Sequence, residues 1–269
     1  MRDVVYAERD GFRPLALDLH LPTRAAAMPD ASSTRPLGGA PLPVVLFLHG
    51  GGWQGGSRRE FGPEVERAFE RITEAGFAVA SVDYRLSGEA VFPAQVDDVR
   101  AAIDWLRDQG PGLGLDATRL VLWGESAGAT LAMLVGLRAD PAARGVIDWY
   151  GPTDFIEHAR ALGREHDPEC SEAKWFGATV GADPATAAAA SPARQVHADA
   201  PPFLIVNGTA DTSVPRSQAV LLSDALAAAG ADATLVLVEG AGHRWEGHVD
   251  RDALLDDAIA FARRVAASA

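Results

Sequence analysis

A serine between two glycines is the part of this chain best suited to nucleophilic chemistry. Residues 124–128 read GESAG, which fits the pattern G-x-S-x-G around Ser126. The apolar run RLVLW precedes it and AGATLAMLVGL follows it, so we expect a strand, a sharp turn and a helix. On such a turn the serine is exposed on a strained backbone, and Gly124 and Gly128 leave the space that the turn needs. The alternative is that Ser126 only caps the helix, although capping requires no glycine two residues earlier.

A glycine-rich stretch upstream could stabilise the negative charge that such a nucleophile creates. Residues 49–53 read HGGGW directly after the apolar run PVVLFL. Backbone N–H groups aimed at a developing oxyanion are typically worth about 2.7–4 kcal/mol each. We expect these donors to be Gly51, Gly52 and Ala127. His49 is expected to orient the loop. A phosphate-binding turn is disfavoured because the chain contains no GxxxxGK[ST] pattern.

A serine nucleophile also needs a base, and the base needs an acidic partner. For a serine on this kind of turn, the expected order along the chain is serine, acid, histidine. Asp211 follows the apolar run PFLIVNG, and His243 follows the run ATLVLVEG. The interval between them leaves room for one helix and one strand. Both residues should therefore lie just beyond the carboxyl ends of strands, where sites on parallel sheets gather.

Other residues compete for these roles. Asp154 follows the preceding apolar run and is an alternative acid, and His248 is an alternative base. A zinc site of His243, Glu246 and His248 is conceivable, but the spacing matches no common ligand pattern. We therefore expect no metal. The remaining histidines singled out by the sequence are expected at the surface: His20, His158, His166 and His197.

The elements that must position these residues alternate along the chain. Eight apolar or alternating runs read as strands: 4–8, 15–21, 43–49, 77–84, 119–124, 145–150, 202–208 and 233–240. Helical spacing of apolar residues occurs at 61–75, 94–108, 127–138, 216–229 and 252–266. Short continuous apolar runs suit strands that are buried on both faces. The alternation predicts an α/β fold of three layers, with a mostly parallel eight-stranded sheet between helices.

One interval departs from this alternation. Residues 153–200 contain no clean strand pattern, and an excursion after a strand's carboxyl end lies over the ligand crevice of such a sheet. We expect a small cap there, the alternative being a poorly ordered surface insertion. Its aromatic residues Phe155, Trp175 and Phe176, together with Trp53, are candidate substrate-binding residues. Residues 23–42, rich in Ala, Pro, Ser and Gly, are expected to form an exposed loop.

Composition narrows the class of protein. The chain of 269 residues, 48% of them hydrophobic, can form one domain over residues 1–269. Its net charge of −13 disfavours nucleic acid and anionic membranes as partners. The single cysteine, Cys170, forms no intrachain disulfide and has no motif around it. No signal-peptide pattern or long apolar run is visible, which favours a cytoplasmic protein unless a leader has been removed. The oligomeric state is left open.

In the order HGGGW, GESAG, TAD and GH, the chain resembles the α/β-hydrolase superfamily over nearly its whole length. More narrowly it looks like hormone-sensitive-lipase-type esterases and the bacterial group of feruloyl and acetyl xylan esterases. Further matching stretches are VDYRL, FPAQVDDVRAAIDWL, YGPTD, PPFLIVNGTAD and VPRSQAVLLSDAL. Two positions depart from the frequent pattern: Ala129 replaces a second glycine, and Glu125 replaces an aspartate. The absence of a long N-terminal cap favours the shorter architecture of the xylan-esterase-like relatives.

The resemblance implies Ser126 as nucleophile, Asp211 as acid and His243 as base, with no cofactor. It also implies that the carboxylates of Asp97 and Asp98 cap a helix and suit its dipole. The expected activity is hydrolysis of a small-molecule ester with a short acyl, acetyl-sugar or hydroxycinnamoyl group. A serine peptidase, an arylformamidase and a non-catalytic binding protein of the same fold remain alternatives. A dehalogenase would need a carboxylate at position 126.

Overall fold

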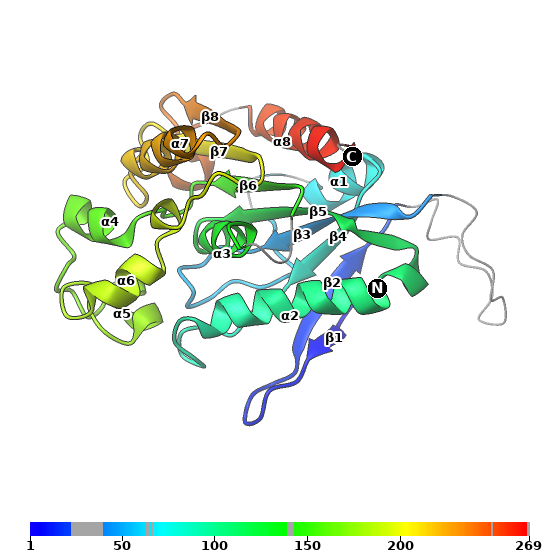
Figure 1. The fold of residues 1–269 in the computed structure, drawn as a ribbon, viewed down its shortest axis with the longest axis horizontal. Coiled ribbons are helices and arrows are strands. Elements are labelled where there is room, and N and C mark those ends of the chain that lie inside the picture. Colours follow the sequence, from blue (N-terminus) through cyan, green and yellow to red (C-terminus); the bar gives the residue numbers. More distant parts are fainter. Residues whose placement is uncertain (23–39, 63–64, 66, 139–142, 249, 268–269) are drawn as a thin grey trace.

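The computed structural model describes residues 1–22, 40–62, 65, 67–138, 143–248 and 250–267. Its centre is an eight-stranded sheet in the order β1-β2-β4-β3-β5-β6-β7-β8 (Figure 1). The strands are β1 (Val4–Ala7), β2 (Leu15–His20), β3 (Leu42–Leu48), β4 (Ala78–Val82), β5 (Leu115–Glu125), β6 (Gly145–Trp149), β7 (Phe203–Gly208) and β8 (Ala233–Val238). Only the pairs β1–β2 and β2–β4 are antiparallel. The predicted mostly parallel eight-stranded sheet is confirmed.

Helices cover both faces of this sheet, as predicted. One face packs against α2 (Ala94–Gln109), α3 (Ala127–Gly136) and α7 (Ser217–Ala229), and the other packs against α1 (Ala68–Glu74) and α8 (Arg251–Ala267). Successive strand residues point to opposite faces. In β3, therefore, Leu46 belongs to the first apolar layer and Phe47 to the second. No helix within the described residues is long and apolar enough to cross a membrane.

Helix α1 begins later than the sequence pattern predicts. Phe61 and Val65 are buried against the same face as the helix, yet the described residues enter a helix only at Ala68. Before that point the chain passes close to the end of β5. A Cβ on Gly62 would lie 2.8 Å from the carboxylate Oε1 of Glu125, so a larger residue here would require this buried side chain to move. The apolar spacing therefore reports burial here rather than a continuous helix.

The interval 153–200, all of which the structure describes, contains three helices and no strand. They are α4 (Phe155–Leu162), α5 (Ser171–Phe176) and α6 (Pro184–Ala189), followed by the 3₁₀ turn η2 (Pro192–Arg194). In Figure 1 the three α-helices form a group beside the sheet, reached from β6. The ring of Trp175 stacks on that of Trp53 with centroids 4.1 Å apart, so this segment packs against the HGGGW loop. Most of the loop expected at 23–42 lies outside the described residues.

Asp97 and Asp98 do not cap α2. The residue before the helix is Pro93, and no side chain makes a capping hydrogen bond there. Asp98 is instead fully buried and accepts hydrogen bonds from the backbone N–H and the guanidinium of Arg85. Asp97 is exposed. The prediction of a structural role is met for Asp98, but through an ion pair that fixes the chain after β4 to the helix.

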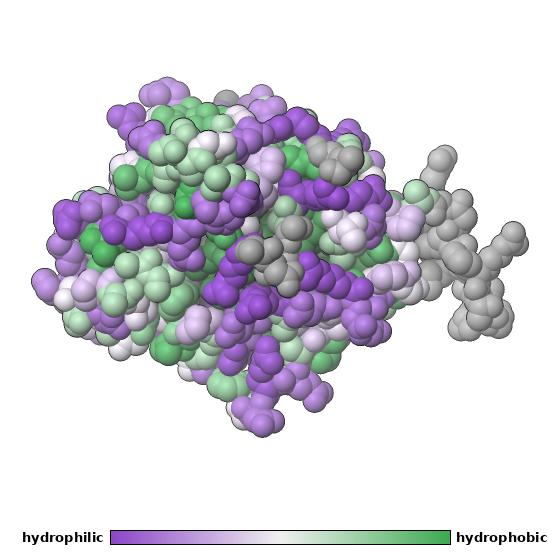
Figure 2. Space-filling view, viewed as in Figure 1, coloured by the Kyte–Doolittle hydropathy of each residue, from purple (hydrophilic) through white to green (hydrophobic). Residues whose placement is uncertain are grey.

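The view in Figure 2 shows hydrophilic residues over much of the surface, with small separate apolar patches between them. The exposed large hydrophobic side chains are scattered along the described chain: Met1, Val5, Phe12, Val91 and Leu237. This distribution is ordinary for a globular surface.

Candidate active site

Ser126 lies on a strained turn between β5 and α3. Its φ of 50° and ψ of −117° fall outside the regions that L-residues commonly adopt. Its side chain makes no capping hydrogen bond to α3, while its backbone N–H donates to Trp149 O at 2.9 Å. The alternative reading of Ser126 as a simple helix cap is therefore wrong. Such strain costs on the order of 1–3 kcal/mol and persists only where the surroundings impose it.

The glycines on either side of the serine are required by close backbone contacts. A Cβ on Gly124 would lie 2.3 Å from Gly128 O, and a Cβ on Gly128 would lie 2.2 Å from Leu48 O. Neither contact can be relieved by rotating a side chain, because both partners are backbone atoms. Ala129 is fully buried in α3, so the turn accommodates alanine at that position.

Three side chains from separate loops form one hydrogen-bonded chain. His243 Nε2 lies 3.1 Å from Ser126 Oγ, and His243 Nδ1 lies 2.7 Å from Asp211 Oδ2. A carboxylate can only accept, so Nδ1 carries a hydrogen and Nε2 is free to accept from the serine hydroxyl. The structure thus brings together the three residues that the sequence proposed, each just beyond the carboxyl end of a parallel strand.

The carboxylate of Asp211 is held from several directions. Its Oδ1 accepts from the backbone N–H groups of Ser213 and Val214, each at 2.8 Å. The side-chain amide of Asn207, at the end of β7, lies 3.5 Å from Oδ2. These contacts leave Oδ2 directed at His243, which is the arrangement that fixes an imidazole in one tautomer.

The loop that carries His243 is also strained. Arg244 and Trp245 have positive φ values of 59° and 63°. The ring of Trp245 packs edge-on against Trp149, and Tyr150 packs against the ring of His243 at 4.9 Å. Gly242 N–H donates to the carbonyl of Glu246 at 2.7 Å and closes the loop. Aromatic packing therefore holds the histidine ring over the serine.

The rival residues lie elsewhere. Asp154 accepts from Ile156 N–H and Glu157 N–H at the start of α4 and pairs with Arg194 at 2.8 Å. The ring of His248 contacts the backbone carbonyl of Asp250. Within the described part of the chain, no three His, Cys, Asp or Glu side chains are grouped to hold a metal ion.

The HGGGW loop passes beside the serine. His49 is buried, stacks on Tyr84 with ring centroids 4.4 Å apart, and places Nδ1 2.7 Å from Gly50 O. Burial lowers the pKa of His49, so its ring is neutral at pH 7. Gly51 has a φ of 113°, and its carbonyl accepts from Gln54 N–H and Gly55 N–H. Its position is that of a tight turn that returns the loop toward the serine.

A cavity of about 230 Å³ opens at this point. It is lined by Gly52, Trp53, Ser126, Ala127, Pro152, His158, Arg164, Ser171, Glu172, Ser213, Val214 and His243. Among the residues predicted to bind the oxyanion or the substrate, Gly52, Ala127 and Trp53 line the cavity, whereas Gly51 does not. Phe155, Trp175 and Phe176 do not line it either. They are buried beneath it in an aromatic cluster, which differs from the expectation that they form its wall.

Among the lining residues that the sequence did not predict, two are buried and ionisable. His158, expected at the surface, is 2% exposed, and Glu172 is 6% exposed. His158 follows Phe155 by three positions and precedes Ala159, so it shares the buried face of α4. That helical spacing was the available signal. Glu172 carried no comparable signal, because its burial depends on how α5 docks on α4.

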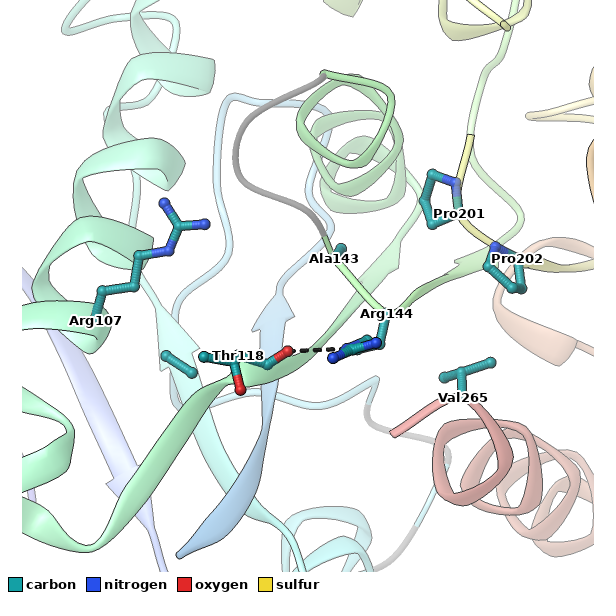
Figure 3. Close-up of a pocket in the computed structure, with 8 residues that line it drawn as sticks. Arg107, Thr118, Ala143, Arg144, Pro201, Pro202 and Val265 are labelled. Atoms are coloured by element: carbon teal, nitrogen blue, oxygen red, sulfur yellow. Dashed lines mark hydrogen bonds between the residues drawn. The ribbon is translucent and has the colours of Figure 1, made fainter. Parts of the chain in front are cut away.

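A larger cavity of about 540 Å³ lies at the opposite ends of the strands from Ser126 (Figure 3). Its lining includes Thr118 near the start of β5, Arg144 just before β6 and Pro202 just before β7. Arg144 Nε donates to Thr118 O at 3.0 Å across its floor. It therefore lies at the amino ends of the strands, away from Ser126. Ligand sites of open α/β sheets lie at the carboxyl ends, so the smaller cavity is the candidate site.

Glu125, the residue before the serine and the last residue of β5, is buried. Burial raises the pKa of its carboxyl group to about 8, and the nearby Arg244 offsets only part of this effect. Arg244 belongs to the loop that carries His243, and Gly62 packs against the same carboxyl group. Glu125 thus lies between the serine turn and the histidine loop.

Comparison with known proteins places this geometry in a family. The model of the BD-FAE family matches residues 34–226, which is more than half of the chain. The chain belongs to the BD-FAE family. It is also 30% identical over 218 residues to esterase LipQ of Mycobacterium tuberculosis, covering 72% of this chain and 48% of LipQ. Carboxylesterase NlhH of the same organism is 31% identical over 207 residues, 72% of this chain and 63% of NlhH. The chain spans about half the length of the curated relatives it matches.

Solved structures share the α/β-hydrolase fold over the whole chain. A truncated carbohydrate esterase from gut microbiota superposes with a TM-score of 0.81 at 25% identity, covering 100% of this chain and 96% of that one. Esterase 2 of Thermogutta terrifontis with bound propionate gives a TM-score of 0.74 at 27% identity, covering 97% and 93% of the two chains. The predicted resemblance is confirmed at the level of family and fold.

The buried Glu125 predicts a pH dependence of stability. In the unfolded chain its carboxyl group titrates near its usual value of 4.5, and in the folded protein near 8. Between these values the folded state binds a proton that the unfolded state does not, so stability falls as pH rises, by at most about 1.4 kcal/mol per pH unit. Glu125→Gln lacks this proton. The free energy of unfolding of this variant, measured by urea titration, should therefore rise relative to that of the wild type steadily from pH 5 to pH 8.

The exposed Glu239, just after β8 and three strands away from Glu125, provides the control. Glu239→Gln leaves the buried carboxyl group in place and should differ from the wild type by a constant amount over this pH range. A constant offset for Glu125→Gln as well would show that Glu125 is not buried as a neutral group.

Proposed function

We propose that this protein is a serine carboxylesterase with Ser126, His243 and Asp211 as its catalytic triad. The observation that carries the proposal is the hydrogen-bonded chain from Asp211 through His243 to a serine on a strained turn. A structural serine does not need this combination. Membership in the BD-FAE family and likeness to esterases support the same activity.

In the proposed reaction Ser126 Oγ attacks the carbonyl carbon of an ester, and His243 Nε2 takes the hydroxyl proton. Asp211 keeps the hydrogen on Nδ1 and stabilises the imidazolium that forms. As the tetrahedral intermediate collapses, His243 returns its proton to the departing alcohol and an acyl-enzyme remains. Water then attacks the acyl carbon by the same route and releases the carboxylic acid. No metal or organic cofactor takes part in these steps.

The oxyanion of the intermediate is proposed to bind backbone N–H groups beside the serine. Gly52 and Ala127 both line the cavity together with Ser126. Ala127 is the first residue of α3, where unpaired N–H groups and the helix dipole both favour negative charge. Gly52 has a positive φ of 59°, which turns this part of the loop toward the serine. Of the three predicted donors, we therefore retain Gly52 and Ala127 and leave out Gly51, which does not line the cavity.

The size of the cavity favours a short acyl group. Its volume of about 230 Å³ is below the usual range of roughly 300–1,000 Å³ for drug-sized ligands. Trp53 is the one Phe, Tyr or Trp among the lining residues, and residues 153–200 supply His158, Arg164, Ser171 and Glu172. We therefore propose acetyl and similarly short esters, including acetylated sugars, ahead of hydroxycinnamoyl esters. Residues 153–200 act as the cap that closes this small site.

A panel of esters and amides tests the proposed activity. Nitrophenyl acetate, propionate and butyrate should be hydrolysed, with the rate falling as the acyl chain outgrows the cavity. Nitroacetanilide and a formyl anilide should be far poorer substrates. Faster cleavage of either amide would instead support a peptidase or an arylformamidase that uses the same three residues.

Substituting the serine should abolish this activity. Ser126→Ala is expected to lower kcat for nitrophenyl acetate by about 10⁶-fold and to prevent covalent labelling by a fluorophosphonate. Ser171→Ala removes another hydroxyl from the same cavity and should still be labelled. Labelling of Ser126→Ala would show that a different residue is the nucleophile, and no labelling of the wild type would favour a non-catalytic protein.

The two candidate acids can be separated by a matched pair of substitutions. Asp211→Asn should lower kcat by about 10⁴-fold, because the amide no longer holds His243 in the required tautomer. Asp154→Asn keeps a side chain that can cap α4 and should lower kcat less than tenfold. Circular dichroism of both variants checks that they fold. The opposite order of effects would move the acid from Asp211 to Asp154.

A further inference from the structure

A buried pair of ionisable side chains forms part of the cavity wall and is not used by the triad. His158 Nδ1 lies 3.3 Å from Glu172 Oε1, and both side chains are more than nine-tenths buried. They come from α4 and α5, the helices that follow β6. Burying two ionisable groups beside a small apolar cluster is costly unless the site uses them.

The hydrogen-bond partners fix the protons of this pair. His158 Nε2 lies 3.0 Å from the carbonyl oxygen of Ser213, which can only accept, so Nε2 carries a hydrogen. Burial alone would raise the pKa of Glu172, but the charge and hydrogen bonding of His158 hold it below its usual value. The pair therefore joins the imidazole ring of His158 to a carboxylate of Glu172.

One oxygen of this carboxylate has no partner within the described residues. Glu172 Oε2 is buried and accepts no hydrogen bond, whereas Oε1 faces His158. The thiol of Cys170 is close in sequence, but its only hydrogen is directed at Asp167 O at 3.1 Å. A buried acceptor without a partner costs roughly 1–3 kcal/mol, more when it is charged. An oxygen left in this state beside a cavity is poised to accept a hydrogen bond from a ligand.

The residue that carries this oxygen lines the same cavity as the reacting serine. Ser171, the residue before Glu172, lies against the HGGGW loop, since a Cβ on Gly52 would be 3.1 Å from Ser171 Oγ. Gly52 and Ser126 line the same cavity as Glu172. Arg164, at the exposed rim, has no hydrogen-bond or ion-pair partner among the described side chains. Polar groups thus occupy the cap side of a cavity that holds the serine.

We propose that Glu172 is a specificity-determining residue that accepts a hydrogen bond from a hydroxyl group of the substrate, so that the enzyme prefers short-chain esters of polyhydroxylated alcohols. The proposal rests on the esterase function proposed above. Ser171 and Arg164 provide further polar contacts for neighbouring hydroxyls of the same alcohol. His158 acts through Glu172, by holding its other oxygen.

Arg164 already supplies a positive charge at the rim of the cavity, which disfavours a cationic substrate and favours a neutral donor. An alkyl group would leave Oε2 buried without a partner, which retains the full cost of desolvation. A hydroxyl satisfies the oxygen without changing the net charge.

The test compares esters that differ only in the group facing Glu172. Glycerol monoacetate and propyl acetate differ by two hydroxyls, and acetylcholine and neohexyl acetate differ by one charge. Wild-type enzyme should have a higher kcat/KM for glycerol monoacetate than for propyl acetate. In Glu172→Leu this ratio should fall about tenfold to a hundredfold, the effect of losing a hydrogen bond to a charged acceptor. The double variant His158→Phe/Glu172→Leu removes both members of the pair together and should show the same fall.

Glu169→Leu is the matched control, because Glu169 is exposed, pairs with Lys174 and does not line the cavity. Its ratio should equal that of the wild type. A wild-type ratio of one or less, an unchanged ratio in both Glu172 variants, or a preference for acetylcholine over neohexyl acetate would overturn the proposal. Failure of the esterase function is distinguishable, because wild-type enzyme would then hydrolyse no ester and Ser126 would take no fluorophosphonate label.

Discussion

The close approach of backbone segments at Gly128 is the contact on which the candidate site depends. The Cα of Gly128 faces the carbonyls of Leu48 and His49 so closely that a Cβ would lie 2.2 and 2.4 Å from them. This contact joins the start of α3 to the end of β3, and it holds Ser126 in a conformation that a free chain would avoid. The HGGGW loop leaves β3 at the same point. One packing constraint therefore positions both the serine and the loop proposed to bind the oxyanion.

Buried charges hold the loops around that point in place. Arg58, just after the HGGGW loop, is buried and pairs with Asp18 of β2 and with Asp83, just after β4. The ion pair of Arg85 and Asp98 fixes the connection between β4 and α2 in the same way. Removing one partner of such a pair is costly, typically about 3–5 kcal/mol, because the other charge is left buried. The loops are thereby anchored to the sheet although they have little regular structure of their own.

Much of this architecture could be predicted from the sequence because it depends on local patterns. Apolar or alternating runs identified all eight strands, and the glycines around Ser126 identified the turn, since both signals depend on neighbouring residues. The late start of α1 could not be predicted, because the apolar spacing of Phe61 and Val65 reports their burial whether or not they are helical. The same is true of Asp98, whose position near a helix start suggested a cap while its partner Arg85 lies on another segment.

The wall of the cavity was the least predictable part. Aromatic residues in 153–200 suggested a binding surface, yet Phe155, Trp175 and Phe176 pack against one another and against Trp53. Large aromatic side chains gain most when fully buried, and composition alone does not say whether a ligand or the core buries them. The polar residues His158 and Glu172 took the positions facing the cavity instead. Which side chains face the cavity depends on how α4 and α5 pack against the rest of the protein, and local sequence patterns do not determine this packing.

A crystal structure of the protein reacted with a small fluorophosphonate tests the central claim most directly. The strained turn is expected to present Ser126 to a preformed oxyanion site. The phosphorus should be bonded to Ser126 Oγ, with its phosphonyl oxygen about 2.7–3.1 Å from the backbone nitrogens of Gly52 and Ala127. Attachment to another residue, or an oxygen on Ser126 that points away from both nitrogens, would contradict the account.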